Sequence, residues 1–194
     1  MLDKKIYEKL KKNYGKTASW AIWKEPGESI KSNMDDVSMF DKDVILKSLN
    51  PNYVFVGLSG SSVGDGYMDT KRPWYNYHSS NPKGNDFKLR YALTDTPYWG
   101  AYMTVAIKDL TASGTMPPVL TDNSEVIKRN MKELREEIDT LGTRPIIVCF
   151  GKQCYELVRV YLGKDFTVKQ LPHYSSLVGK DAYRESLIKE LADK

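Results

Sequence analysis

Four short apolar runs, separated by segments of helical periodicity, constrain the fold of this 194-residue chain more than any other feature. The runs cover residues 53–58, 101–107, 145–150 and 166–171, and the first three are continuous rather than alternating. A strand that is apolar on both sides must be buried on both faces, which is typical of a parallel sheet between two helical layers. The pattern therefore predicts an α/β protein, a three-layer αβα sandwich with a central, mostly parallel four-stranded sheet.

Apolar residues at helical spacing lie before and between these runs. The corresponding segments are residues 2–14, 127–141, 154–161 and 183–191. Residues 19–40 have no such periodicity, and we expect a short helix over residues 41–49. There is no internal repeat, and a chain of this length can bury a sizeable core without metals or disulfides. We expect a single domain over residues 1–194.

Composition excludes several classes of protein. With 41% hydrophobic and 28% charged residues, the chain is neither disordered nor fibrous. The net charge is +4, and residues 1–16 alone hold six lysines against two acidic residues, so the basic surplus lies on the first helix. Such a helix is either an ordinary solvated face or a surface that attracts phosphates.

No apolar stretch reaches the ~18 residues needed to cross a bilayer, and no hydrophobic signal segment follows Met1. We therefore expect a cytoplasmic protein with no membrane partner. Cys149 and Cys154 are expected to be reduced thiols of the core. With only two histidines and no cysteine cluster, the sequence predicts no metal site and no cofactor.

Function is expected at the carboxyl ends of the strands, because ligands of such sheets bind in the crevice beyond those ends. The loops after Leu58, Ile107 and Leu171 are the ones to examine. The first of them, residues 59–66, is rich in glycine and serine, so its backbone N–H groups could approach an anion. It matches neither dinucleotide nor P-loop patterns, and a simple tight turn is the alternative.

His173 and a group of aromatic residues are the other candidates. His173 follows the fourth strand, where an imidazole can donate to a developing anion or carry a proton. Trp74, Tyr75 and Tyr77 offer faces on which a base could stack, and filling the core is the alternative for each of them.

Taken in order, four segments resemble the uracil-DNA glycosylase superfamily, over about two thirds of the chain. Residues 54–61 (VFVGLSGS) resemble its first catalytic motif, a strand ending in Gly followed by Asn or Asp and usually Pro. Residues 103–108 (MTVAIK) resemble its central strand, commonly Thr-Asn-x-x-Lys. Residues 144–151 (RPIIVCFG) resemble the strand that ends in Gly before a helix, and residues 171–177 (LPHYSSL) resemble the second catalytic motif, His-Pro-Ser with a nearby Leu.

The resemblance implies an enzyme that flips a damaged base out of DNA and hydrolyses its glycosidic bond. It implies catalytic roles for His173, Ser59 and Asp65, with His173 stabilising the leaving base. It further implies a base pocket, in which Tyr77 is the stacking platform with Trp74 behind it. It also implies a DNA-binding set, in which Leu177 is the wedge that fills the gap left in the duplex. The pocket set is Gly57, Leu58, Gly60, Trp74, Tyr77, His78, Thr104 and Val105, and the DNA-binding set is Ser61, Ser62, Ser175, Ser176 and Leu177.

The chain departs from the family pattern at several motif positions. Ser59 stands where the family has Asn or Asp, so water activation would fall to a neighbour such as Asp65. Gly60 and Tyr174 replace prolines, and Val105 replaces the asparagine that reads uracil. The four cysteines of the iron–sulfur branch are absent, so no cluster is expected.

Three functions stay open on this evidence from the sequence. The first is a glycosylase-like enzyme that acts on DNA or another nucleobase-containing ligand. The second is a non-enzymatic module of the same fold that binds nucleic acid or a nucleotide. The third is an unrelated αβα hydrolase or nucleotide-binding enzyme, which the small basic surplus favours because DNA binders usually carry a larger one.

Overall fold

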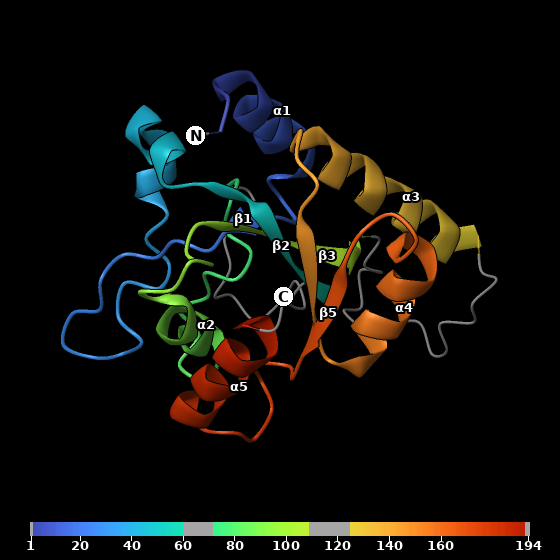
Figure 1. The fold of residues 1–194 in the computed structure, drawn as a ribbon. Coiled ribbons are helices and arrows are strands. Elements are labelled where there is room, and N and C mark those ends of the chain that lie inside the picture. Colours follow the sequence, from blue (N-terminus) through green and yellow to red (C-terminus); the bar gives the residue numbers. More distant parts are fainter. Residues whose placement is uncertain (1, 60–71, 109–124, 193–194) are drawn as a thin grey trace.

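A computed structural model describes residues 2–59, 72–108 and 125–192 of the chain (Figure 1). Within these residues a five-stranded, mixed but mostly parallel sheet is flanked by five α-helices. The elements, in chain order, are α1 (Lys4–Tyr14), β1 (Ser19–Trp20), the 3-10 helices η1 (Ser38–Asp41) and η2 (Asp43–Lys47), β2 (Asn50–Ser59), α2 (Asp86–Leu93), β3 (Ala101–Ile107), α3 (Glu125–Thr140), β4 (Ile146–Phe150), α4 (Lys152–Leu162), β5 (Val168–Leu171) and α5 (Lys180–Ala192).

The strand order in the sheet is β1-β3-β2-β4-β5. Strands β2 to β5 pair in parallel, with Val56 opposite Thr104 on one side and Cys149 on the other. The prediction of four strands is wrong by one, because β1 adds an antiparallel strand at the edge beside β3. Two residues are too few to show any periodicity, so the sequence carries no signal for this strand.

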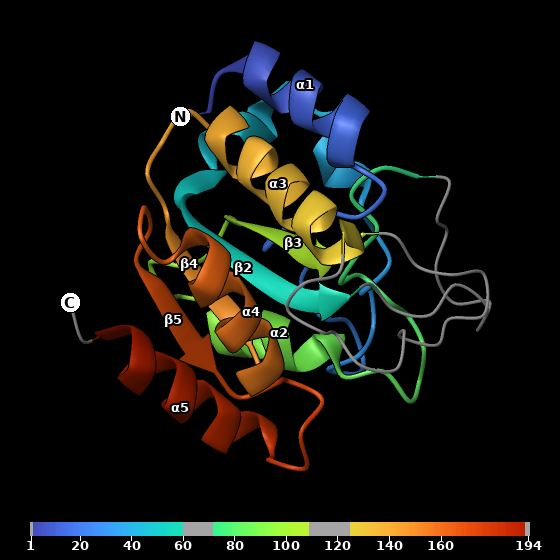
Figure 2. The ribbon, with the colours of Figure 1, turned by 90° about the vertical axis from the view of Figure 1, so that its right-hand side faces the viewer.

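The helices cover both faces of the sheet (Figures 1 and 2). Successive side chains of a strand point to opposite faces. On β2, Val54 and Val56 belong to the core shared with α1, α3 and α4, whereas Phe55 belongs to the core shared with α2 and α5. Strand β3 is buried along its whole length. The continuous apolar runs therefore predicted a sheet buried on both faces correctly.

The predicted helices at residues 2–14, 127–141, 154–161 and 183–191 are confirmed as α1, α3, α4 and α5. Helix α1 begins where the carboxylate of Asp3 accepts hydrogen bonds from the N–H groups of Lys5 (2.8 Å) and Ile6 (3.3 Å). None of the helices in the three described stretches is long and apolar enough to cross a membrane. Both cysteines are buried and free, as expected.

Two predictions about the middle of the chain need correction. In place of the helix expected over residues 41–49 the structure has the 3-10 helix η2. The extended backbone of Lys42 (φ −110°, ψ 129°) separates it from η1, which ends at Asp41. Helix α2 was not predicted. Its buried residues include Asp86, Lys88 and Arg90 as well as apolar ones, so the helix has no apolar stripe that the sequence could reveal.

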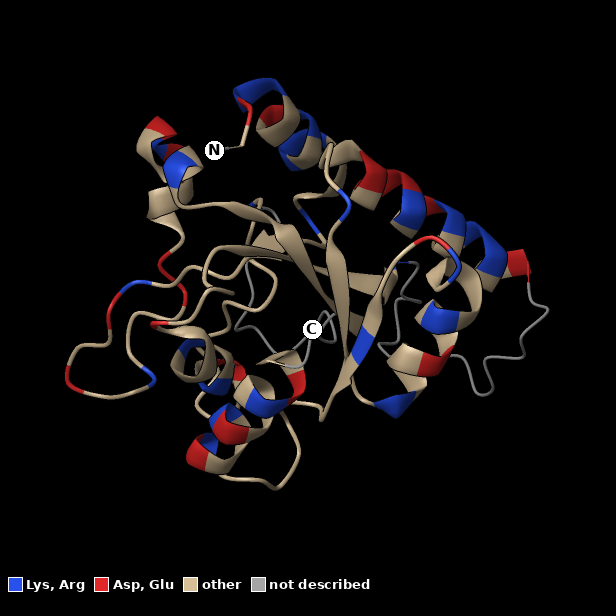
Figure 3. Cartoon of the chain, in the orientation of Figure 1, with Lys and Arg blue, Asp and Glu red and all other residues tan. Residues whose placement is uncertain are grey.

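The charges lie mostly on the helices, and the strands are almost free of them (Figure 3). Part of the basic surplus on α1 is paired, since Lys4 contacts Asp43 at 2.6 Å and Lys11 contacts Asp41 at 3.5 Å. The exposed side of α3 carries residues of both signs. The surface formed by α1 and α3 is thus of mixed charge rather than a uniformly positive face.

One ion pair is buried under α3. The ammonium of Lys108, just after β3, lies 2.6 Å from the carboxylate of Glu137, and both side chains are almost fully buried. The other carboxylate oxygen of Glu137 accepts hydrogen bonds from the hydroxyls of Tyr102 and Thr104, both at 2.8 Å. These bonds fasten β3 to α3. Removing one member of such a pair leaves a buried charge without compensation.

We predict that Glu137→Gln lowers the free energy of unfolding by about 3–5 kcal/mol, because it leaves the buried Lys108 ammonium unpaired. Glu136→Gln is the matched control, since Glu136 is exposed and lies 3.9 Å from Lys132. It should cost less than about 0.5 kcal/mol. Urea unfolding of the three proteins measures both values. Equal, small losses in the two variants would contradict the role given to this pair.

Candidate functional site

A pocket lies at the edge of the sheet where the parallel strands end. It has a volume of about 280 Å³, close to the lower end of the range for small-molecule sites. We call it the His173 pocket. Its lining residues are Leu58, Ser59, Phe150, Gly151, Lys152, Gln153, Cys154 and His173. It thus brings together Ser59 and His173, two of the three catalytic residues predicted from the sequence, beside an aromatic ring.

Three strand ends build the pocket. Strand β2 ends at Ser59 and β4 ends at Phe150, while His173 follows two residues after the end of β5. Gly151 turns the chain from β4 into α4 with a φ of +84°. L-residues that carry a side chain rarely adopt this backbone conformation. Its N–H donates to the carbonyl of Leu171 at 2.7 Å, which ties the end of β4 to the end of β5.

The first turn of α4 gives the pocket a positive potential. Lys152 and Gln153 open the helix, Gly151 supplies no capping side chain, and no acidic residue lies in the first turn. Backbone N–H groups at a helix N-terminus carry a partial positive charge and favour anions. Developing negative charge in the pocket would therefore be stabilised by this helix.

His173 is held by its neighbours on the same loop. Its ring stacks on Tyr174, with 4.7 Å between ring centroids and 20° between planes, and contacts Phe150 edge-on at 6.4 Å. Its Nδ1 accepts a hydrogen bond from the N–H of Ser175 at 3.2 Å. The neutral imidazole consequently carries its proton on Nε2. His173 as a whole is exposed, but its ring packs against Tyr174 and Phe150. The resulting desolvation lowers the pKa of His173 below its usual value, which favours this neutral form at neutral pH.

The predicted DNA-binding residues of the second motif lie on the same loop as His173. Ser175 is exposed, Ser176 is half-buried, and Leu177 is fully exposed to solvent. The N–H of Ser176 donates to the carbonyl of His173 at 2.9 Å, so the loop folds back on the histidine. The structure thus places these three residues beside the His173 pocket.

Trp74 and His78, both predicted pocket residues, lie elsewhere. Trp74 is completely buried and packs edge-on against Trp20 and Tyr102, with centroids 6.1 and 6.3 Å away. His78 is also completely buried, and its ring contacts those of Trp23 (5.2 Å) and Phe40 (5.7 Å). Their prediction as pocket residues is therefore wrong, because both rings are packed in the core and neither is accessible to a ligand.

The predicted pair Thr104 and Val105 is divided between the two faces of the sheet. The hydroxyl of Thr104 points to α3, where it donates to Glu137, whereas Val105 lies in the core with α2 and α5. Their side chains point to opposite faces of the sheet, as those of adjacent strand residues do. Thr104 is therefore a structural residue, which corrects its place in the predicted site.

Tyr77 fills the space above Gly57 that was predicted to admit a ligand. Its hydroxyl donates to the carbonyl of Thr104 at 2.7 Å and accepts from the N–H of Gly57 at 3.1 Å, so it bridges β3 and β2. A Cβ at position 57 would lie 2.5 Å from this hydroxyl oxygen, which explains the glycine. Tyr77 is buried, contacts Phe150 at 6.2 Å and has a φ of +65°. It supports the wall behind the pocket instead of offering an open stacking face.

Leu58, predicted for the base pocket, lines the His173 pocket. Gly60, Ser61, Ser62 and Asp65 lie outside the described residues.

Phe150, Gly151 and the first turn of α4 were missed by reasoning from the sequence. A signal for them was present, because the rule that ligands bind at the carboxyl ends of strands applies to the third apolar run as well as to the other three. The Gly that directly follows Phe150 marks the turn into a helix.

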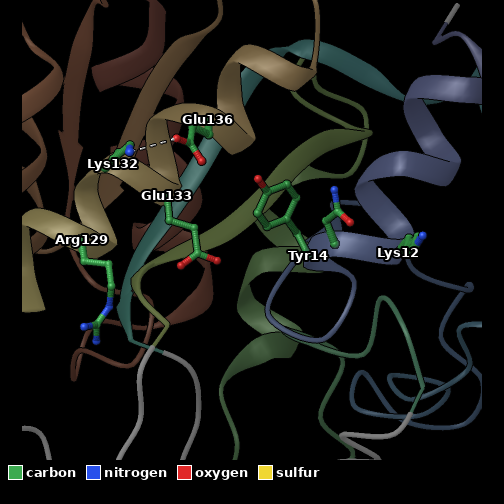
Figure 4. A pocket seen from close by; sticks show the side chains of 7 residues that line it. Lys12, Tyr14, Arg129, Lys132, Glu133 and Glu136 are labelled. Atoms are coloured by element: carbon green, nitrogen blue, oxygen red, sulfur yellow. Dashed lines mark ion pairs between the residues drawn. The ribbon is translucent and has the colours of Figure 1, made fainter.

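A larger hollow of about 610 Å³ lies between α1 and α3, on the outer side of the helical layer (Figure 4). Its cations are Lys12, Arg129 and Lys132, and the carboxylates of Glu133 and Glu136 lie among them. The ammonium of Lys132 is 3.9 Å from Glu136. Three cations and two carboxylates leave the hollow only a small positive excess, and it shares no lining residue with the His173 pocket.

Comparison of the sequence with models of known protein families and with curated proteins finds no match.

We predict that Tyr77→Phe lowers the free energy of unfolding by at least about 2 kcal/mol, because it leaves the buried N–H of Gly57 and the carbonyl of Thr104 without their partner. Tyr91→Phe is the matched control. The hydroxyl of Tyr91 donates to Asp181 at 2.6 Å on the exposed surface, so this change should cost below about 1 kcal/mol. Chemical denaturation compares the two, and a Tyr77 variant as stable as the Tyr91 variant would refute the bridging role.

Burial lowers the pKa of His78 to about 4, so the imidazole is neutral in the folded protein at pH 7. The unfolded chain, with a histidine pKa near 6.5, binds the proton more readily between pH 6.5 and 4. Stability is then complete above pH 6.5 and falls as the pH falls towards 4, by about 2–3 kcal/mol at pH 4.5.

Urea unfolding at pH 7.5 and 4.5 tests this expectation. The pH-dependent loss should disappear in His78→Gln and persist for the most part in His173→Gln, because His173 is exposed. A loss that survives in the His78 variant would show that other groups cause it.

Proposed function

We propose that this protein is a DNA-glycosylase-like enzyme of the uracil-DNA glycosylase fold type, which hydrolyses the N-glycosidic bond of a damaged or deaminated base. The observation that carries the proposal is that Ser59 and His173 line one pocket with Phe150 at the carboxyl ends of the parallel strands. The order of the four motif-like segments along the chain supports the same conclusion.

The chemistry fits the charges in the pocket. When the glycosidic bond breaks, its electron pair leaves with the base, and the oxygen of a water molecule bonds to the sugar carbon. The departing base becomes an anion until it takes a proton. A neutral His173 with its proton on Nε2 can donate to that anion, and the N-terminus of α4 adds positive potential beside it. Both groups interact more strongly with the anionic leaving base than with the neutral substrate, so they favour bond cleavage.

Ser59 is the part of the site that differs from a uracil enzyme. A serine hydroxyl can orient a water molecule, but it is a poor base at neutral pH. Val105 is fully buried against α2 and α5 and offers no hydrogen bond to a base. We therefore propose a substrate base other than uracil, one that leaves readily enough for a weakly activated water.

The recognition of DNA would come from the loop that follows β5. Ser175 offers an exposed hydroxyl for a phosphate, whereas the hydroxyl oxygen of Ser176 is buried. The exposed Leu177 side chain is suited to fill the gap left by a flipped base. These residues lie next to His173, so binding of the strand and capture of the base would occur together.

A second candidate function is a non-catalytic module of the same fold that binds nucleic acid or a nucleotide. The serine at position 59 favours it, because the pocket has no carboxylate among its lining residues in the described part of the chain. Such a module would keep the pocket and the loop but hydrolyse nothing.

A base-excision assay separates the two functions. Duplex and single-stranded oligonucleotides that carry uracil, hypoxanthine, mismatched thymine or alkylated bases serve as substrates. We expect excision of at least one base, a rate reduced by roughly 10²–10³-fold in His173→Ala through loss of a hydrogen-bond donor, and a smaller reduction in Ser59→Ala.

The matched control is Ser48→Ala, because Ser48 is an exposed serine just before β2, at the opposite end of the strand that Ser59 terminates. It should excise at the wild-type rate. Salt-sensitive DNA binding without excision of any base would instead establish the binding module, and an active His173→Ala enzyme would refute the assigned chemistry.

A further inference from the structure

A lysine of α2 reaches across to the loop that carries the exposed leucine. Lys88 is a buried residue, and its ammonium donates to the carbonyl of Ser176 at 3.0 Å and to the carbonyl of Val178 at 2.9 Å. These carbonyls belong to the residues on either side of Leu177. One side chain therefore fixes the backbone before and after the leucine.

This contact continues to His173 through the loop itself. The N–H of Ser176 donates to the carbonyl of His173, and the N–H of Ser175 donates to its Nδ1. Lys88 holds Ser176, and Ser176 in turn holds the histidine. The orientation of the imidazole and the projection of Leu177 thus depend on the same anchor.

The burial of the Lys88 ammonium costs free energy of folding. In residues 2–59, 72–108 and 125–192 its ammonium forms no ion pair with a carboxylate, and its hydrogen bonds go to the two loop carbonyls. Burying an ammonium without an opposite charge is unfavourable. Leu177, in contrast, is completely exposed, although the exposure of an apolar side chain to water is unfavourable. A fixed loop that presents an apolar tip is explained by a partner that receives this tip.

We propose that Lys88 is a positioning residue, which holds residues 173–178 in the shape that presents Leu177 to duplex DNA and His173 to the base. This inference rests on the proposed function. It assigns to α2 a role in DNA engagement although α2 lines no part of the His173 pocket.

The test uses the full chain with Lys88→Met, which keeps the length of the side chain and removes its donors. Lys88→Gln is a second variant, whose amide is too short to reach both carbonyls, and Lys88→Arg retains charge and donors. Lys169→Met is the matched control, because the ammonium of Lys169 also donates to a carbonyl, that of Glu190 at 3.2 Å, away from this loop. It removes the same charge, so a general loss of attraction to DNA appears in both variants.

Two measurements are made on each protein. Fluorescence anisotropy gives the affinity for a duplex with a tetrahydrofuran abasic-site analogue, which leaves a gap for a wedge, and for the same duplex with intact bases. Amide hydrogen exchange reports the order of the backbone over residues 175–179. Thermal unfolding identifies any variant that fails to fold.

We expect the wild type to prefer the gapped duplex, and this preference to fall roughly tenfold or more in folded Lys88→Met or Lys88→Gln, as in Leu177→Ala. Exchange over residues 175–179 should rise in Lys88→Met and Lys88→Gln alone, and Lys88→Arg should keep the wild-type preference and exchange. A Lys88→Met protein with wild-type preference and exchange would overturn this inference while leaving the proposed function intact. A wild type that does not distinguish the duplexes would instead overturn the proposed function.

Discussion

Strand β2 pairs in parallel with β3 on one side and β4 on the other, and the rest of the structure depends on this arrangement. Parallel strands need crossover connections, so helices must cover both faces of the sheet. They also end at one edge, where β5 joins them beside β4. The pocket with Ser59 and His173 therefore follows from the pairing, although the two residues are far apart in the sequence.

Two buried polar contacts keep the end of β3 in place, one on each face. On the side of α3, Glu137 binds Lys108, Tyr102 and Thr104. On the side of α2 and α5, the hydroxyl of Tyr77 bridges β3 and β2. Buried polar groups that are paired with one another favour one arrangement of a core. They hold the strands rigidly where a ligand would bind, and a rigid framework is what places catalytic groups accurately.

The sequence was sufficient to predict those elements whose buried residues recur with a regular spacing. The four long strands and the helices α1, α3, α4 and α5 were predicted because each buries a continuous run or a stripe. It was insufficient for α2, whose buried Lys88 and Arg90 look like surface residues in a sequence, and for the two-residue strand β1. For the site, the rule of strand ends predicted Ser59 and His173, and both residues line one pocket in the structure. The prediction was wrong for Trp74 and His78, because a sequence does not distinguish aromatic residues that fill a core from those that stack on a base.

The most direct test of the account is whether a base enters the His173 pocket. The protein has two histidines, so their imidazole signals can be followed by NMR while free nucleobases or a duplex with an abasic-site analogue are added. The account predicts shifts for His173 and for the amides of Ser59, Gly151 and Lys152, with the buried His78 as an unchanged internal reference. Shifts confined to residues outside this pocket, or none at saturating ligand, would contradict it.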